Sequence, residues 1–178
     1  MYDKSYLYEV IPQNHYNQIY NLYKEVVPSN IRMFAKQFIN PQPITERNFT
    51  QQELDAMRDA YYNSQHTGDK KTIQYDDYPR TTKGGGLSES LIPLVAKSMV
   101  DKGLSTSYTL GRVNKIYHSP QGNVHLSDIY NFKPSSEFAD EAGVWSEVMR
   151  RAHDIAAKYG SPMSVDINLG NPKNWKGY

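Results

Sequence analysis

The feature that most constrains the fold is a β-hairpin pattern in the second half of the chain. Within residues 108–132, two β-compatible runs flank the turn composition Ser-Pro-Gln-Gly-Asn at 119–123. A third run, Met-Ser-Val-Asp-Ile-Asn-Leu at 163–169, alternates apolar and polar residues with period two. We therefore expect strands from about Thr106 onward. Strands this few and short need helices to cover their apolar face.

Helical spacing accounts for most of the remaining chain. Apolar residues recur at intervals of three and four in five segments: 14–27, 29–38, 51–65, 87–100 and 138–159. Pro28 ends the first of these helices, Ser29 caps the second, and Thr50 with Glu53 forms a capping box before the third. The pattern predicts an α+β fold in which a small antiparallel β-sheet packs against helices, preceded by an N-terminal helical arm.

The sequence Asn-Pro-Gln-Pro at 40–43 divides the chain. Two prolines within three positions remove backbone donors and disfavour helix before them. We therefore predict a helical arm and linker over residues 1–43 and an α+β domain over residues 44–178. Residues 1–12 have an extended pattern, and residues 71–75 form a plausible short strand.

Charge and composition exclude several classes of function. A net charge of +1 argues against a broad basic face, so no nucleic-acid partner is predicted. With no cysteine, the chain has neither disulfides nor thiolate chemistry. The first twenty residues lack the apolar core of a signal peptide, and no run approaches the roughly 18 apolar residues of a membrane span. We expect a soluble protein made in its host's cytoplasm without an export signal.

Tyrosine is unusually abundant, with 15 copies among 178 residues. An apolar ring with a polar tip suits a protein–protein interface, although an ordinary tyrosine-rich surface explains the count equally well. We expect the arm to contact other protein subunits through its aromatic residues, which are Tyr16, Tyr20, Tyr23, Phe34 and Phe38.

Other groups capable of chemistry are sparse. The histidines show no metal-binding spacing; His118 and His125 flank the hairpin turn and can face each other across it, but such a pair is more often solvated than metallated. Residues 84–86 are three glycines, which we interpret as a loop because the order of a phosphate-binding loop is missing. Asp76 and Asp77 are adjacent, and turn chemistry explains them. No metal site or cofactor is predicted.

The hairpin leads into Asp128-Ile-Tyr130-Asn131-Phe132, and a helix and a strand follow. This order over residues 104–170 resembles the catalytic domain of the colicin M family and related phage-encoded domains. The resemblance implies a scaffold built to cleave lipid-linked peptidoglycan precursor with the help of Mg²⁺. Asn131 stands where the family has a second aspartate. Glu137 and Phe138 stand where it has a His-Arg pair.

These departures favour a non-catalytic relative. Our main hypothesis is a structural or interaction protein, a bacteriophage virion component. The alternative is an envelope-directed phosphodiesterase of the colicin M kind, with Asp128, Tyr130 and Glu137 as catalytic residues and Mg²⁺ at Asp128. A third interpretation needs no site, because Tyr130 and Phe132 also fit the buried aromatic edge of a strand.

Overall fold

The fold is described from a computed structural model for residues 13–66, 71–79, 91–138 and 147–175. Its α-helices in these ranges are α2 (Gln13–Val26), α3 (Ser29–Ile39), α4 (Gln51–His66), α5 (Leu91–Val100), α6 (Lys102–Leu110) and α8 (Glu147–Tyr159). Its strands are β1 (Lys115–His118), β2 (Val124–Tyr130) and β3 (Met163–Gly170). Short 3-10 turns are η1 (Glu46–Asn48), η2 (Tyr75–Asp77), η3 (Ser135–Phe138) and η4 (Pro172–Asn174). The predicted α+β class with a small antiparallel sheet is confirmed.

The three strands form one antiparallel sheet in the order β1-β2-β3. The predicted turn closes the hairpin, because the Gly122 amide donates to the Ser119 carbonyl (2.8 Å) and the Ser119 amide donates to the Asn123 carbonyl (2.9 Å). Gly122 has φ +79°, a conformation that side chains rarely adopt. In β3 the predicted alternation is confirmed, since every second residue from Met163 to Leu169 is buried.

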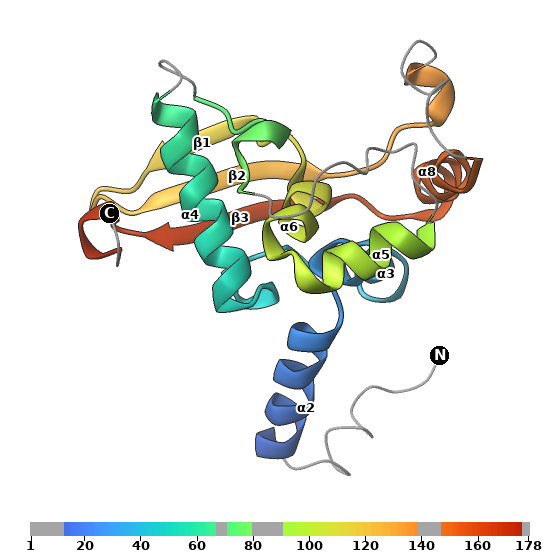
Figure 1. Ribbon diagram of the computed structural model, residues 1–178, viewed down its shortest axis with the longest axis horizontal. Coiled ribbons are helices and arrows are strands. Elements are labelled where there is room, and N and C mark those ends of the chain that lie inside the picture. Colours follow the sequence, from blue (N-terminus) through green and yellow to red (C-terminus); the bar gives the residue numbers. More distant parts are fainter. Residues whose placement is uncertain (1–12, 67–70, 80–90, 139–146, 176–178) are drawn as a thin grey trace.

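Helices cover the apolar face of this sheet. Figure 1 shows α4 and α6 lying across the strands, and α4 contacts β3 directly. The buried face of β3 joins Val124, Leu126 and Tyr130 of β2 in the core. Beyond β3, the edge is covered by the chain at Ile44, whose amide donates to the Ser164 carbonyl (2.8 Å). One face of the sheet, the dry face, is therefore buried against helices, and the other, the wet face, is exposed to solvent.

A buried polar cluster joins α3, α4 and α6. The capping box is confirmed: the Glu53 amide donates to Thr50 Oγ1 (3.2 Å), and the Thr50 amide donates to Glu53 Oε2 (2.9 Å). Glu53 also pairs with Arg32 (2.5 Å) and accepts from the Ser29 amide (3.2 Å). Ser29 is thus the first residue of α3 and not its cap. The Ser105 hydroxyl accepts from the same amide (2.9 Å), which attaches α6 to the cluster.

The expectation that strands begin near Thr106 is wrong, because residues 102–110 form α6. Serine and threonine are weak helix formers, because their hydroxyls compete for backbone hydrogen bonds and threonine loses side-chain freedom in a helix. Here Thr106 Oγ1 donates to the Lys102 carbonyl (2.6 Å) and Thr109 Oγ1 donates to the Ser105 carbonyl (2.8 Å). These bonds satisfy the hydroxyls inside the helix, so burial decides the structure.

Several expectations fall partly or wholly outside the described residues. The extended segment 1–12 and the glycines at 84–86 lie outside them. The helix expected at 138–159 is described from Glu147. Within the described residues, the expectation of a strand at 71–75 is wrong, because only an isolated bridge between Ile73 and Val113 forms there and Tyr75 already belongs to η2.

Helix α2 projects away from the body, as Figure 1 shows. None of its residues is buried. Lys24 Nζ donates to the Arg47 carbonyl (3.3 Å), and Lys102 Nζ donates to the Glu25 carbonyl (3.1 Å). By contrast α3 packs against α6, so within the segment 1–43 it is α2 that stands apart.

Candidate functional site

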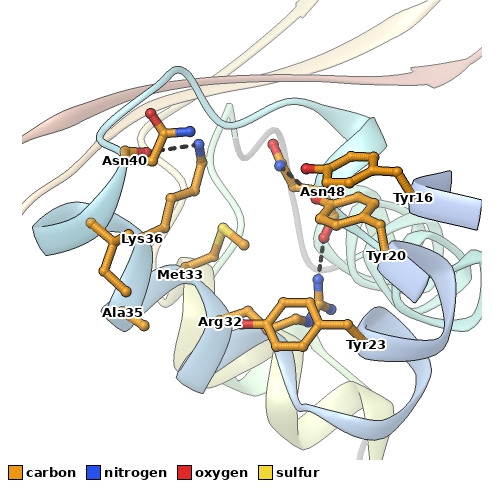
Figure 2. Close-up of a pocket in the computed structure, with 10 residues that line it drawn as sticks. Tyr16, Tyr20, Tyr23, Arg32, Met33, Ala35, Lys36, Asn40 and Asn48 are labelled. Carbon is orange, nitrogen blue, oxygen red and sulfur yellow. Dashed lines mark hydrogen bonds between the residues drawn. The ribbon is translucent and has the colours of Figure 1, made fainter. Parts of the chain in front are cut away.

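An open cleft of about 390 Å³ separates α2 from α3. Figure 2 shows Tyr16, Tyr20 and Tyr23 of α2 on one side and Met33 and Lys36 of α3 on the other. The Tyr16 and Tyr20 rings lie parallel, with centroids 6.4 Å apart. Three of the predicted interface residues therefore share one side of this cleft, where their ring faces are partly covered.

Hydrogen bonds fix the polar side chains that line this cleft. Asn48 Nδ2 donates to the Tyr20 hydroxyl (3.3 Å), and Arg32 donates to the Asn48 carbonyl. Lys36 Nζ donates to the Asn40 carbonyl (3.2 Å), and partial burial lowers the pKa of Lys36. Among the described residues that line the cleft, none carries a carboxylate.

Beside the tyrosines, α2 carries aliphatic residues that face solvent. Ile19, Leu22 and Val26 are 58%, 65% and 51% exposed. Their spacing of three and four residues puts them in one row along the helix, which we call the aliphatic stripe. A row of this kind is typical of a helix that packs against another helix.

Phe34 and Phe38, the other predicted interface residues, lie on a different face of α3. With Arg151, Ala152 and Ile155 of α8 they line a groove of about 450 Å³, which we call the α3–α8 groove. Its walls are almost entirely apolar side chains, and the side chain of Ile155 is half exposed. Sequence reasoning placed all five aromatic residues on one face; the structure distributes them between the cleft and this groove.

Asp128 and Tyr130 line a third hollow, the Asp128 groove, of about 570 Å³. It lies between the C-terminal end of α6, the end of β2 and the side chain of His153 on α8. Arg112 and Lys133 are also in its lining, so in the part of the chain that the structure describes two cations and an imidazole accompany a single carboxylate there.

The carboxylate of Asp128 is fully engaged with neighbouring backbone and amide groups. It accepts from the Asn114 amide N–H (3.0 Å) and from Asn114 Nδ2 (3.2 and 3.3 Å). Its Oδ1 also accepts from the Ile129 amide (2.7 Å). These bonds tie the chain that precedes β1 to the end of β2, which is a structural role.

The aromatic residues of the motif continue into the helices. The Phe132 ring makes edge contacts with three other rings. The distances between ring centroids are 5.4 Å to Tyr130, 5.6 Å to Phe34 and 4.8 Å to His153. Burial raises the pKa of Tyr130 far above its usual range, so its hydroxyl stays protonated. Burial also lowers the pKa of His153. A hydrogen bond with the Lys133 backbone and the charge of Asp154 act in the opposite direction and reduce this lowering of the pKa.

Glu137, the third catalytic residue under the enzyme hypothesis, lies in η3 and outside the lining of the Asp128 groove. Its carboxylate is exposed and forms an ion pair with Lys133 (3.6 Å). The structure therefore brings Asp128 and Tyr130 together but does not bring Glu137 to them.

His118 and His125 do not face each other. The register pairs Tyr117 with His125, so the two histidines occupy opposite faces of the hairpin. On the wet face, His125 Nδ1 lies 2.9 Å from Asp166, and the Tyr117 hydroxyl donates to the same carboxylate (3.0 Å). Among the described residues, no group of three potential ligands is arranged to hold a metal ion.

Sequence reasoning missed the partners of these sites. Arg112, Lys133 and His153 come from three separate elements, and no spacing rule joins them to Asp128. Likewise, nothing in the pattern of α3 separates the Phe34 side from the Lys36 side until α8 is placed. On a helical wheel of α2 the aliphatic stripe adjoins the tyrosines, so the sequence pattern does show a broad apolar side of this helix.

Comparisons with protein-family models, with curated proteins and with solved structures gave no match to this chain. Within the described ranges, no helix combines the length and the apolar character needed to cross a bilayer.

Proposed function

We propose that this chain is a non-catalytic structural or interaction protein whose α2 helix binds another protein subunit. The observation that carries the proposal is the exposure of the aliphatic stripe on a helix that buries no residue of its own.

The low stability expected of α2 as an isolated helix supports this proposal. Isolated helices shorter than about 12–15 residues are marginal in water, and α2 has 14 residues, including Asn14, Asn17 and Asn21. Burying an Ile, Leu or Val side chain contributes about 1.5–3 kcal/mol. A partner that covers Ile19, Leu22 and Val26 therefore supplies what the helix does not obtain from its own chain.

The assembly that we propose is a bacteriophage virion. Support for the virion comes from the resemblance of residues 104–170 to phage-encoded domains, and support for a non-catalytic role comes from the engaged carboxylate of Asp128.

Quantitative mass spectrometry of particles purified from the source of the chain tests this proposal. The wild-type chain should occur at fixed stoichiometry, and Leu22→Glu should lower its incorporation at least tenfold. Asn21→Glu is the matched control, because it adds the same charge one residue away on another side of α2. Absence of the wild-type chain from particles, or normal incorporation of Leu22→Glu, would contradict the proposal.

A second candidate function is the phosphodiesterase, favoured by one observation. Arg112, Lys133 and His153 line the same groove as Asp128, and cations in one pocket with an acid are suited to a phosphate ester. The test is Mg²⁺-dependent release of the pyrophosphorylated headgroup from lipid-linked peptidoglycan precursor. Turnover that Asp128→Asn abolishes would support the enzyme; no turnover by the folded wild-type protein would reject it.

A further inference from the structure

The cleft between α2 and α3 has the size and the lining of a site for a small ligand. Its volume of about 390 Å³ falls within the range of about 300–1,000 Å³ that is usual for such sites. Its walls include the rings of Tyr16, Tyr20 and Tyr23 on α2 and the apolar side chains of Met33 and Ile39 on α3. We call it the tyrosine cleft. A ligand with an apolar body exchanges water for contacts with both helices there.

The charge of the tyrosine cleft favours an anion. Lys36 lines the cleft, and none of the described lining residues carries a carboxylate. Arg32, the other cation among them, is already neutralised by its ion pair with Glu53. Lys24 adds positive charge beside the α2 wall, because its Nζ lies 5.3 Å from the centroid of the Tyr20 ring. An anion that enters the cleft therefore meets uncompensated positive charge.

Lys36 has N–H groups to spare for such an anion. Its Nζ carries three of them, and within the described residues it donates to one acceptor, the Asn40 carbonyl (3.2 Å). That oxygen also accepts from the Gln42 amide (2.7 Å), and a neutral carbonyl does not balance the ammonium charge. Partial desolvation lowers the pKa of Lys36, as it does for a cation without an ion pair. A carboxylate at Nζ accepts the remaining N–H groups in charge-assisted hydrogen bonds.

The tyrosine rings favour a planar, aromatic ligand body. The Tyr16 and Tyr20 rings are within 3° of parallel, with centroids 6.4 Å apart. Figure 2 shows the rings of Tyr16, Tyr20 and Tyr23 extending from α2 toward α3, across the cleft from Lys36. Tyr16 and Tyr23 are each 41% exposed, so part of their surface is open to a ligand. Aromatic rings attract one another at centroid distances of about 4.5–7 Å, which a ring inside the cleft can reach.

We propose that the tyrosine cleft binds a small aromatic carboxylate. The ring of the ligand packs against the tyrosines and Met33, and its carboxylate accepts hydrogen bonds from Lys36 Nζ. A further N–H group is present at Asn48 Nδ2, which donates only one of its two to the Tyr20 hydroxyl. The inference does not rest on the proposed function, because it uses the tyrosines and not the aliphatic stripe. A ligand that contacts both helices also fixes the angle between α2 and α3.

The competing explanation of Lys36 is a helix cap. A lysine in the last turn of a helix that donates to a terminal carbonyl stabilises the helix by itself. This role uses one of the three N–H groups and requires neither the tyrosines nor the cleft. The two explanations differ in what a soluble aromatic carboxylate does, so a binding measurement separates them.

Titration of the full chain with phenylacetate, followed in proton–nitrogen NMR correlation spectra, tests the proposal. The probe should bind with a Kd near 1 mM, roughly what a ligand of this size reaches, and should shift amide signals of α2 and α3. Phenylacetamide has the same shape without the charge and should bind about tenfold more weakly. Absence of phenylacetate binding at about 10 mM would overturn the proposal, and so would equal binding of the amide.

Two pairs of variants locate the site. Lys36→Met keeps the apolar stem and removes the charge, so phenylacetate should bind about tenfold more weakly, whereas Lys158→Met at an exposed position of α8 should bind it normally. Tyr16→Leu should weaken binding about threefold through loss of the ring, and Tyr62→Leu, at a similarly exposed position of α4, is its control. The amide signals of α4 and β2 show whether each variant is folded. Normal binding by either folded cleft variant would overturn the proposal.

Discussion

Helices α2 and α3 are consecutive, similar in length and both amphipathic, yet they have opposite environments. Helix α3 buries Arg32, Met33 and Gln37, and α2 buries nothing. The difference lies in what each helix finds in the rest of the chain. Arg32 forms an ion pair with Glu53, which belongs to the capping box at the start of α4. No comparable partner within the described residues covers the stripe of α2. An amphipathic pattern shows that a helix has an apolar face, and not which molecule covers it.

The sharpest way to break this comparison is to remove the polar anchor of α3. Glu53→Gln leaves the Arg32 guanidinium buried without a compensating charge, which typically costs about 3–5 kcal/mol. Urea unfolding followed by circular dichroism measures this loss. Asp55→Asn on the exposed side of α4 is the control, with an expected change within about 0.5 kcal/mol. A loss below about 1 kcal/mol for Glu53→Gln would show that the cluster does not hold α3.

The same substitution made in each region provides a direct comparison of burial. Leu126 in β2 is fully buried, so Leu126→Ala should lower the free energy of unfolding by about 2–5 kcal/mol. Leu22→Ala in α2 should change it by no more than about 0.5 kcal/mol in the monomer. Equal losses at the two positions, measured in dilute protein, would place α2 inside the cooperative fold.

The cap of α4 should have an intermediate effect. Thr50→Ala removes the side chain that accepts from the Glu53 amide, and loss of such a cap costs about 1 kcal/mol. Thr50→Ser keeps the acceptor and is the control. If the alanine and serine variants unfold at the same urea concentration, the cap does not contribute to stability.

The smallest expected effect is a dependence of stability on pH through His153. Burial lowers the pKa of His153 in the folded chain below its ordinary value of 6.5. At a pH between the lowered pKa and 6.5, the unfolded chain therefore binds a proton at His153 that the folded chain does not. The free energy of unfolding should therefore fall as the pH drops below about 6.5. His153→Gln should make this dependence shallower, as urea unfolding from about pH 8 to about pH 5 would reveal. An unchanged or steeper slope in the variant would contradict the assignment.

Local rules found the features whose cause is local. The turn at 119–123, the alternation in β3 and the Thr50–Glu53 box each depend on neighbouring residues, and the structure confirms all three. They sufficed to predict the α+β class. Local rules were wrong at Thr106, where burial against α3 and α4 outweighs the strand preference of a Ser- and Thr-rich segment.

The candidate sites depended on contacts that no local rule contains. Phe34 and Phe38 were predicted as interface residues of an arm, and the groove that they line exists only because α8 packs beside α3. Asp128 was chosen for its motif, and the sequence pattern does not show that Arg112 and His153 line the same groove. The aliphatic stripe is visible in the sequence pattern, but the predicted interface included only the aromatic residues of the arm.

Hydrogen–deuterium exchange read by mass spectrometry, on the isolated chain and on purified particles, tests most directly whether α2 lies outside the fold and is covered by a partner. In the isolated chain, amides of α2 should exchange almost as fast as an unstructured peptide, while those of α3 stay protected. In particles, protection should rise in α2, with α4 unchanged. Protection of α2 equal to that of α3 in both samples would contradict the claim.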